Sequence, residues 1–348
     1  MRALTIVCGQ TNGAALTDVP EPSADEGSVL VQTLAMGVCG TDREIVAGAL
    51  GKPAEGCDSL VLGHESLGRV LEAPPDSGFA PGDLVVGIVR RPDPVPCLNC
   101  AAGEWDMCRN GLYTECGIKE REGFGRERFR IEPEFLVRLD SRLGRTGVLL
   151  EPASVLAKAW EQIEYIGRRT RWAPQRILVT GAGPVGLLAA LMGQQRGLEL
   201  HVLDIVETGP KPQLVRDLGG MYHTGSVDEV ARLADIIIEC TGYGPLVFDC
   251  IRHTPRGGMV CLTGLSAGKR SIEIDPARFN TRTVLENDVI FGTVNANRRH
   301  YEQGADALGK ADPAWLERLI TRRVPLDRWQ EALRPDPQNV KSVIEFAA

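Results

Sequence analysis

The first 150 residues carry their apolar positions in short runs that recur about every ten residues. Residues 29–34, 67–72 and 84–89 are examples, and residues 81–83 (Pro-Gly-Asp) supply turn chemistry before the last of them. The opening residues, 1–7, also read as a strand. Short apolar runs between Gly- and Pro-rich turns predict an antiparallel, barrel-like β domain.

The pattern changes near residue 150. Glu151 and Pro152 open a stretch in which apolar residues follow helical spacing through Ile166. Proline suits the first turn of a helix, because its missing N–H has no partner there. Glu151 is therefore expected at the rigid start of a helix.

A glycine-rich turn follows the next apolar strand, residues 176–180, and a helical run follows the turn. This is the G-x-G-x-x-G pattern in its required setting, and the next strand ends in an acid, Asp204. The first glycine makes the tight turn, the second lets the backbone approach a pyrophosphate, and the third lets the helix pack close to the strand. The residues predicted to bind a dinucleotide here are Gly181, Gly183, Pro184, Val185 and Gly186.

Two further predicted strands end in Thr-Gly pairs, Thr241-Gly242 and Thr263-Gly264. Ligands of open α/β sheets lie at the carboxyl ends of the strands. Both pairs are therefore expected to border the nicotinamide half of the cofactor. The alternative is that each Thr-Gly pair only forms an ordinary turn and contacts no cofactor.

The end of the chain mixes two helical stretches with a final strand, residues 343–346, which is expected to return to the first domain. The predicted fold class is α/β with two domains, a barrel-like β-rich domain and a doubly wound parallel sheet. The predicted boundaries are 1–168 for a catalytic domain, 169–296 for a dinucleotide-binding domain, and 297–348 for the return to the catalytic domain.

Composition narrows the possible partners. The 348 residues carry a net charge of −7, with acids and bases mixed and no basic stripe, so nucleic acid is not an expected partner. No apolar run reaches about 18 residues, so no membrane span is expected. The N-terminus lacks the pattern of a signal peptide, and we predict a cytoplasmic protein.

Ten cysteines are present, but they are not spaced like a disulfide framework. Cys97, Cys100 and Cys108 crowd into one segment, with Cys116 beyond, and in a reducing compartment such a cluster indicates metal binding. Others lie in apolar surroundings and are expected to be small buried hydrophobes: Cys8, Cys240, Cys250 and Cys261.

A second candidate metal site is centred on His64, which lies between Gly63 and Glu65 and is one of five histidines in the chain. Cys39 lies upstream between glycines. A thiolate, an imidazole and nearby carboxylates are the ligand types that a catalytic Zn²⁺ prefers. Taken alone, His64 is equally well explained as a core histidine.

Together these motifs give the chain a resemblance to the zinc-containing medium-chain dehydrogenases over its whole length. The motifs, in order, are residues 37–42 around Cys39, Gly63-His64-Glu65, Pro81-Gly82-Asp83, the clustered cysteines, Glu151-Pro152 and the turn 181–186. Within that family the chain is similar to the glucose 1-dehydrogenases. The features typical of this branch are residues 39–44, Glu115 before Cys116, and residues 294–297 leading to His300.

The resemblance implies a GroES-like catalytic domain, a Rossmann cofactor domain, and Cys39, His64 and Glu151 as ligands of a catalytic zinc. It makes Glu65 either a direct or interchanging ligand or an outer carboxylate that tunes charge. It gives the hydroxyl of Thr41 the relay of the alcohol proton. The alternative for Thr41 is a cap on the helix that follows.

The activity implied is oxidation of an aldose at C1 to a lactone, with hydride transfer to NAD(P). The alternatives are a polyol, cyclitol or secondary-alcohol dehydrogenase, and a non-catalytic nucleotide-binding protein. Expected contacts to the sugar or polyol come from Thr41, Glu115, Glu151, Asn295 and Asn297. Residues 88–92 depart from archaeal relatives, which carry an asparagine there; either an arginine or a backbone group replaces it, or the sugar preference differs.

Three further expectations follow from the resemblance. The clustered cysteines are similar to a structural zinc lobe that normally has four cysteines; Cys116 or Asp106 could complete it, or the lobe has lost its metal. Asp204 favours NAD, because its charge repels a 2′-phosphate, while Lys211 leaves NADP use open. We also expect a homodimer or homotetramer, with residues 288–292 as a pairing edge strand.

Overall fold

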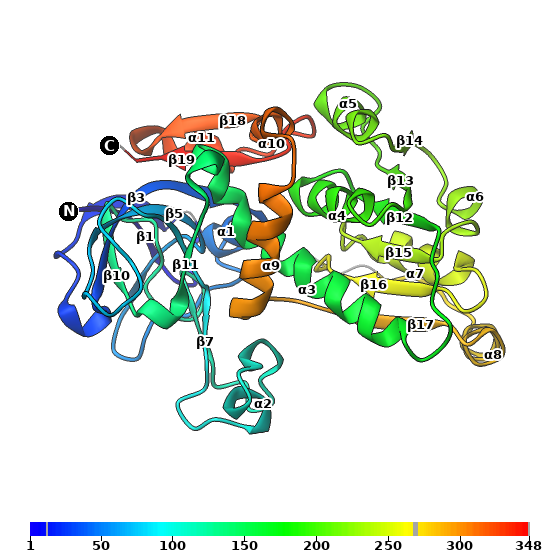
Figure 1. The fold of residues 1–348 in the computed structure, drawn as a ribbon, viewed down its shortest axis with the longest axis horizontal. Helices are drawn as coiled ribbons and strands as arrows, with labels where there is room; N and C mark the ends of the chain where they lie inside the picture. Colours follow the sequence, from blue (N-terminus) through cyan, green and yellow to red (C-terminus); the bar gives the residue numbers. More distant parts are fainter. Residues whose placement is uncertain (12, 267–270, 347–348) are drawn as a thin grey trace. The chain divides into compact units, whose positions relative to one another are not determined.

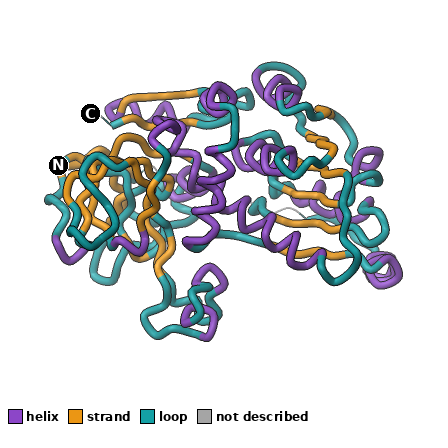
Figure 2. The backbone as a smooth tube through the Cα atoms, in the orientation of Figure 1, coloured by secondary structure: helices purple, strands orange, loops and turns teal. Residues whose placement is uncertain are grey.

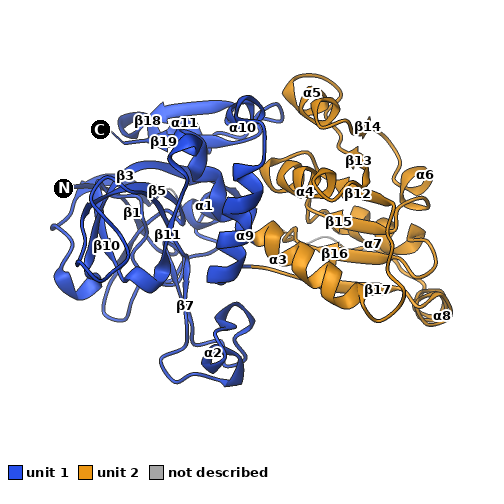
Figure 3. Ribbon diagram, in the orientation of Figure 1, with its two compact units in different colours: residues 1–154, 295–348 blue, residues 155–294 orange. Residues whose placement is uncertain are grey.

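The computed structural model describes residues 1–11, 13–266 and 271–346 (Figure 1). Strands and loops dominate the chain up to residue 138, and helices alternate with strands from α3 (Leu150–Gly167) onward (Figure 2). The chain divides into two compact units, residues 1–154 with 295–348, and residues 155–294 (Figure 3).

The first unit is built on a seven-stranded sheet. Its strand order is β11 (Leu136–Arg138), β6 (Leu84–Gly87), β5 (Glu65–Glu72), β3 (Val29–Val38), β19 (Ser342–Glu345) and β18 (Arg322–Pro325), with β10 (Arg128–Ile131) also paired to β3. Two three-stranded sheets complete it: β2 (Ala14–Asp18), β1 (Arg2–Val7) and β4 (Ser59–Val61); and β7 (Arg90–Arg91), β8 (Thr114–Cys116) and β9 (Glu120–Arg121). Most pairings are antiparallel, as the short apolar runs predict.

The C-terminal strand β19 lies beside β3, antiparallel, with Ser342 opposite Val38 and Glu345 opposite Ala35. Ile344 of β19, and Phe346 just after the strand, join a core that also contains Met36 and Leu62. The tail of the chain is thereby placed beside the strand that leads to Cys39.

Helices of the first unit connect and cover these strands. They are α1 (Gly40–Val46), α2 (Leu98–Ala101), α9 (Arg298–Gly309), α10 (Pro313–Leu319) and α11 (Trp329–Leu333), with short 3₁₀ turns η1 (Ala24–Glu26), η2 (Trp105–Met107), η3 (Pro133–Phe135), η4 (Ser141–Leu149) and η5 (Leu326–Arg328). None of the helices in the described part of the chain is long and apolar enough to cross a membrane.

The second unit is a six-stranded parallel sheet, as predicted for a doubly wound fold. Its order is β14 (Met221–His223), β13 (Glu199–Leu203), β12 (Arg176–Thr180), β15 (Ile236–Glu239), β16 (Met259–Leu262) and β17 (Val289–Gly292). Counted along the chain this is 3-2-1-4-5-6, the order of dinucleotide-binding sheets. Between the strands run α4 (Pro184–Gln194), α5 (Pro210–Asp217), α6 (Asp228–Ala231), α7 (Gly244–His253) and α8 (Pro276–Glu286).

Candidate active site

Cys39 lies at the junction of β3 and α1, where it is the N-cap residue in an extended conformation. Asp42 closes this junction, because its Oδ2 accepts a hydrogen bond from the backbone N–H of Cys39 at 2.8 Å. The backbone N–H of Thr41 donates to the Cys39 sulfur at 3.3 Å. The local turn therefore fixes where the thiol points.

His64 follows Gly63, whose φ of +98° favours glycine, and it directly precedes β5. Its Nε2 lies 3.1 Å from the Cys39 sulfur, and its Nδ1 lies 3.3 Å from Oδ1 of Asp42. A carboxylate behind the second ring nitrogen orients a histidine for metal binding. Sequence reasoning missed this role of Asp42, although its position three residues after Cys39 was a usable signal.

The charges around His64 support one another. Burial alone would lower the pKa of His64, but the Asp42 carboxylate and the Cys39 thiol raise it well above the usual value. Burial would likewise raise the pKa of Asp42, and His64 keeps it below its usual value instead. This pocket stabilises positive charge, as a cation site requires.

Glu65 is buried, and its Oε2 forms an ion pair with the buried Nζ of Lys341. Burial would lower the pKa of Lys341, but the charge of Glu65 raises it. Gly37 makes room for this pair, since a Cβ there would lie 2.0 Å from Oε2 of Glu65. Sequence reasoning missed Lys341, which reaches the site only because β19 pairs with β3.

Glu151 lies in the first turn of α3, as its sequence predicts, and is half-buried. Burial and the negative charge of Glu65 raise the pKa of Glu151 to about 7, and His64 opposes them. Glu151 is thus electrostatically part of the same cluster.

The residues present fit a zinc ion. One ligand atom each from Cys39, His64 and Glu65 lies within 4.8 Å of the others, and together they offer sulfur, nitrogen and oxygen. Glu151 is not among these three, so its ligation stays a prediction. Thr41 is half-buried beside the cluster, and within the described chain its hydroxyl has no recorded hydrogen bond, so it does not cap α1.

Two of the predicted sugar contacts meet each other in the first unit. Asn295 donates from its side-chain amide to Oε1 of Glu115 at 2.7 Å. Arg90 donates to the same oxygen from Nε and Nη2, at 3.0 and 2.9 Å. Arg90, which lies in the 88–92 segment, is therefore bonded directly to a predicted substrate-contacting residue, Glu115.

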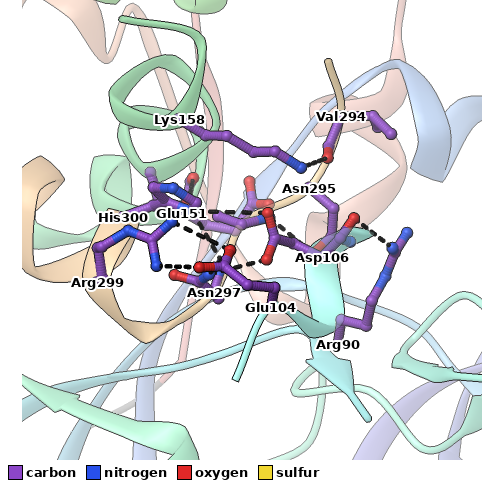
Figure 4. Close-up of polar contacts among 12 residues, drawn as sticks. Arg90, Glu104, Asp106, Glu151, Lys158, Val294, Asn295, Asn297, Arg299 and His300 are labelled. Carbon is purple, nitrogen blue, oxygen red and sulfur yellow. Dashed lines mark hydrogen bonds and ion pairs between the residues drawn. The ribbon is translucent and has the colours of Figure 1, made fainter. Parts of the chain in front are cut away.

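Asn297 is engaged with a different partner. Its amide donates to Oδ1 of Asp106 at 2.8 Å and to Glu104 at 3.3 Å, and Arg299 forms an ion pair with Glu104 (Figure 4). Its backbone N–H donates to Nδ1 of His300 at the start of α9. Asn297 thus holds the segment around Asp106 to α9, and its contact to a substrate stays a prediction.

The glycine turn of the second unit lies between β12 and α4. Gly181 has a φ of +89°, and a Cβ on Gly186 would lie 1.8 Å from the carbonyl oxygen of Gly181. Only glycine permits this turn and this close packing. Gly183 is the N-cap of α4, with Pro184 and Val185 in the first turn.

Asp204 follows β13, and its carboxylate already has protein partners. Oδ2 accepts from the backbone N–H of Ala182 at 2.6 Å and lies 3.3 Å from Nζ of Lys211, while Oδ1 accepts from Val206. Lys211 therefore balances the charge of Asp204.

The two Thr-Gly pairs are linked through Glu239 at the end of β15. Oε1 of this buried carboxylate accepts from Thr241, Oε2 accepts from the N–H of Gly242 at 3.1 Å, and its carbonyl accepts from the Thr263 hydroxyl. Gly264 lies against Gly242, since a Cβ on it would be 2.2 Å from the Gly242 nitrogen. The pairs form one rigid edge, and their contact to a nicotinamide stays a prediction.

Comparison with known proteins decides the family. The model of the glucose dehydrogenase C-terminus matches residues 144–346, and that of the alcohol dehydrogenase GroES-like domain matches residues 25–141. The chain belongs to the zinc-containing medium-chain dehydrogenases, in their glucose 1-dehydrogenase branch. The family, the GroES-like domain and the two-domain fold predicted from the sequence are confirmed.

Individual relatives agree with this family. Glucose 1-dehydrogenase of Methanocella arvoryzae is 38% identical, with all of both chains covered. Glucose 1-dehydrogenase 1 of Caldivirga maquilingensis is 36% identical, with 99% of each chain covered. The structure of Haloferax mediterranei glucose dehydrogenase in complex with NADP, Zn and gluconolactone superposes with a TM-score of 0.92 at 31% identity, over all of both chains.

This dehydrogenase carries a second candidate metal site, made of Cys97, Cys100 and Cys108, whose sulfur atoms lie within 4.8 Å of one another. Backbone N–H groups, first that of Arg109, lower the pKa of Cys97 to about 6, while burial raises that of Cys100 to about 11. Cys116 and Asp106 are not in this cluster; Cys116 lies buried in β8.

Metal analysis of the purified dehydrogenase tests whether this cluster holds a structural zinc. We expect two zinc ions per chain, falling to one in Cys100→Ser, because thiolates are the preferred ligands of structural zinc. Cys116→Ser is the matched control and should retain both ions. One zinc per chain in the unmodified protein would show that the cluster is empty.

Proposed function

We propose that this protein oxidises the C1 hydroxyl of a cyclic aldose, with glucose as the leading substrate, to the lactone and transfers hydride to NAD(P). The observation that carries the proposal is the Cys39–His64–Glu65 cluster, in which His64 and Glu65 are buried and Cys39 is half-buried, and which fits zinc. The glucose dehydrogenase relatives and the structure that contains NADP, Zn and gluconolactone support the sugar as substrate.

The residues have separate roles in this proposal. Cys39, His64 and Glu151 would hold the zinc ion. Glu65, which pairs with Lys341, would either bind the ion directly or adjust the charge around it. A bound zinc ion supplies a Lewis acid that eases loss of the alcohol proton near neutral pH. The Thr41 hydroxyl takes that proton onward, and Glu115, Asn295 and Asn297 bind sugar hydroxyls, either directly or through the groups they hold.

A substrate panel tests the proposed function. NADH and NADPH formation is measured with glucose, galactose, xylose, sorbitol and inositol. We expect the highest kcat/KM with an aldose. Preference for sorbitol or inositol would instead make the protein a polyol or cyclitol dehydrogenase on the same fold.

The same assay tests cofactor choice. We propose NAD as the preferred cofactor, because the carboxylate of Asp204 opposes a 2′-phosphate. Lys211 is paired with Asp204 and reduces this opposition, so NADP is also accepted. A kcat/KM for NADP above that for NAD would contradict the preference.

We further propose a cytoplasmic homodimer or homotetramer. The parallel sheet has β17 at one edge, and nearby α8 exposes Val284 and Leu285. An unpaired edge strand is a natural surface for a second copy. Light scattering that gives a monomer would contradict this assembly.

Thr41→Ala is expected to lower kcat by about a hundredfold or more, which is the usual contribution of a positioned proton-transfer group. The zinc content should stay unchanged, because Thr41 contacts Cys39 through its backbone N–H. Thr41→Ser restores the hydroxyl and should retain most of kcat. An unchanged kcat in Thr41→Ala would reject the relay role.

A further inference from the structure

We propose that Arg90 is a positioning residue that fixes which oxygen of Glu115 faces the substrate, and that it thereby selects sugars that carry a hydroxyl group at that point. The inference rests on the proposed function and deepens it. It concerns the segment 88–92, for which the sequence left open whether an arginine or a backbone group acts.

Arg90 and Glu115 are directly opposite each other in the antiparallel pair β7–β8. Both side chains are nearly buried, with 7% and 12% of their surface exposed. Nε and Nη2 of Arg90 donate to Oε1 of Glu115, while Nη1 donates to the carbonyl oxygen of Asp106 at 3.2 Å. The guanidinium also lies over the ring of Tyr113, 3.6 Å from its centre. Arg90 is held on three sides and cannot swing toward a ligand without losing these contacts.

Asn295 completes the arrangement from another part of the chain. It has a φ of +62°, in the left-handed region that asparagine adopts more readily than most residues other than glycine. Its Oδ1 accepts from the N–H of Ala296 at 2.8 Å, which leaves the amide nitrogen to donate to Oε1 of Glu115. Three N–H groups thus converge on one carboxylate oxygen.

The second oxygen of Glu115 has no recorded partner in the described part of the chain. As the ion-pair partner of Arg90, Glu115 is a carboxylate, and a carboxylate only accepts hydrogen bonds. Oε2 therefore suits an O–H donor. A ligand that covers this oxygen without offering a donor would leave it unpaired, and sites with such polar groups reject analogues that lack the donor.

Backbone contacts connect this pair to the metal cluster within the first unit. Gly117, two residues after Glu115, lies against Gly63, because a Cβ on it would be 2.6 Å from the Gly63 carbonyl oxygen. His64 is the next residue. Val89, the residue before β7, donates its N–H to the hydroxyl of Tyr301 in α9. α9 packs against the first turns of α3, which carry Glu151, because a Cβ on Gly304 would lie 3.1 Å from the Ser154 nitrogen. β7 therefore begins, and β8 ends, beside segments that carry residues of the metal cluster.

The experiment compares Arg90→Gln and Arg90→Lys with a matched control, Arg91→Gln. Arg91 is equally buried, pairs with Glu132 and lies over the ring of Phe135, but it has no contact with Glu115. KM and kcat are measured for glucose and for its 2-, 3-, 4- and 6-deoxy analogues, together with the thermal midpoint of each variant.

We expect Arg90→Gln to raise KM for glucose about tenfold or more while kcat changes much less, because a charge-assisted contact is lost. The unmodified protein should disfavour at least one deoxy analogue by about ten- to a hundredfold, and Arg90→Gln should lose that discrimination. Arg90→Lys keeps the positive charge but lacks the planar guanidinium with its several N–H donors, and it should recover part of the discrimination. Arg91→Gln should lose stability but keep KM and the discrimination.

Two results would overturn the proposal while leaving the proposed function intact. One is a KM and a deoxy-sugar discrimination in Arg90→Gln within about twofold of those in Arg91→Gln. The other, which needs no variant, is equal use of glucose and all four deoxy analogues by the unmodified protein. If the unmodified protein oxidises no aldose at all, the proposed function fails, and the role of Arg90 in sugar binding fails with it.

Discussion

His64→Ala is expected to lose the catalytic zinc and about a thousandfold or more of kcat/KM. The loss corresponds to about 4 kcal/mol, in the range that a Lewis acid contributes to stabilising charge in the transition state. The reason is geometric: the ring presents Nε2 to the Cys39 sulfur at 3.1 Å and has Asp42 behind it. Zinc content and steady-state kinetics with glucose measure the effect.

The control for this variant is His253→Ala. His253 is a half-buried histidine in the last turn of α7, far along the chain from every predicted ligand. The His253→Ala variant should retain zinc and activity. Full zinc occupancy in His64→Ala would show that His64 is a core histidine and not a ligand.

Lys341→Met is expected to destabilise the protein by about 3–5 kcal/mol, because it leaves the buried carboxylate of Glu65 without a counter-charge. Both side chains are almost completely buried, so water cannot take the place of the lost partner. Urea denaturation followed by tryptophan fluorescence measures the change.

Two further variants identify the cause of that loss. In Lys341→Met combined with Glu65→Gln the buried charge is gone, and most of the stability should return. Lys310→Met removes an exposed ion pair with Asp306 and should cost only about 0.5 kcal/mol or less. If Lys341→Met is as stable as Lys310→Met, the Lys341–Glu65 pair does not contribute the stability assigned to it.

The cofactor domain was predictable because its signals are local. The turn from Gly181 to Gly186 depends on the backbone freedom of individual glycines, and the flanking strand and helix are its immediate neighbours in the chain. The order of the six parallel strands then follows from a common topology rather than from side-chain detail.

The individual residues of the candidate site could be predicted from the sequence, but most of the contacts among them could not. Sequence reasoning selected Cys39, His64 and Glu65, which the structure brings within ligand distance of one another. It gave Glu115 and Asn295 the same substrate role, and the structure places them in contact. It did not anticipate that Asn297 holds Asp106, because that contact joins segments nearly two hundred residues apart.

The features that could be predicted from the sequence are those encoded by neighbouring residues. These are the β-rich first domain, the helix start at Glu151, the dinucleotide turn and the resemblance to zinc dehydrogenases. Spacing, turn chemistry and helix capping act over a few residues, so they can be read from one chain.

Which charges balance one another depends on the fold of the whole chain. Lys341 reaches Glu65 because β19 pairs with β3, Asp42 in α1 reaches His64 just before β5, and Arg90 meets Glu115 across β7 and β8. A buried charge requires a partner, but any of many charged residues could supply it. The choice depends on strand register and long-range packing, which no local pattern of this sequence specifies.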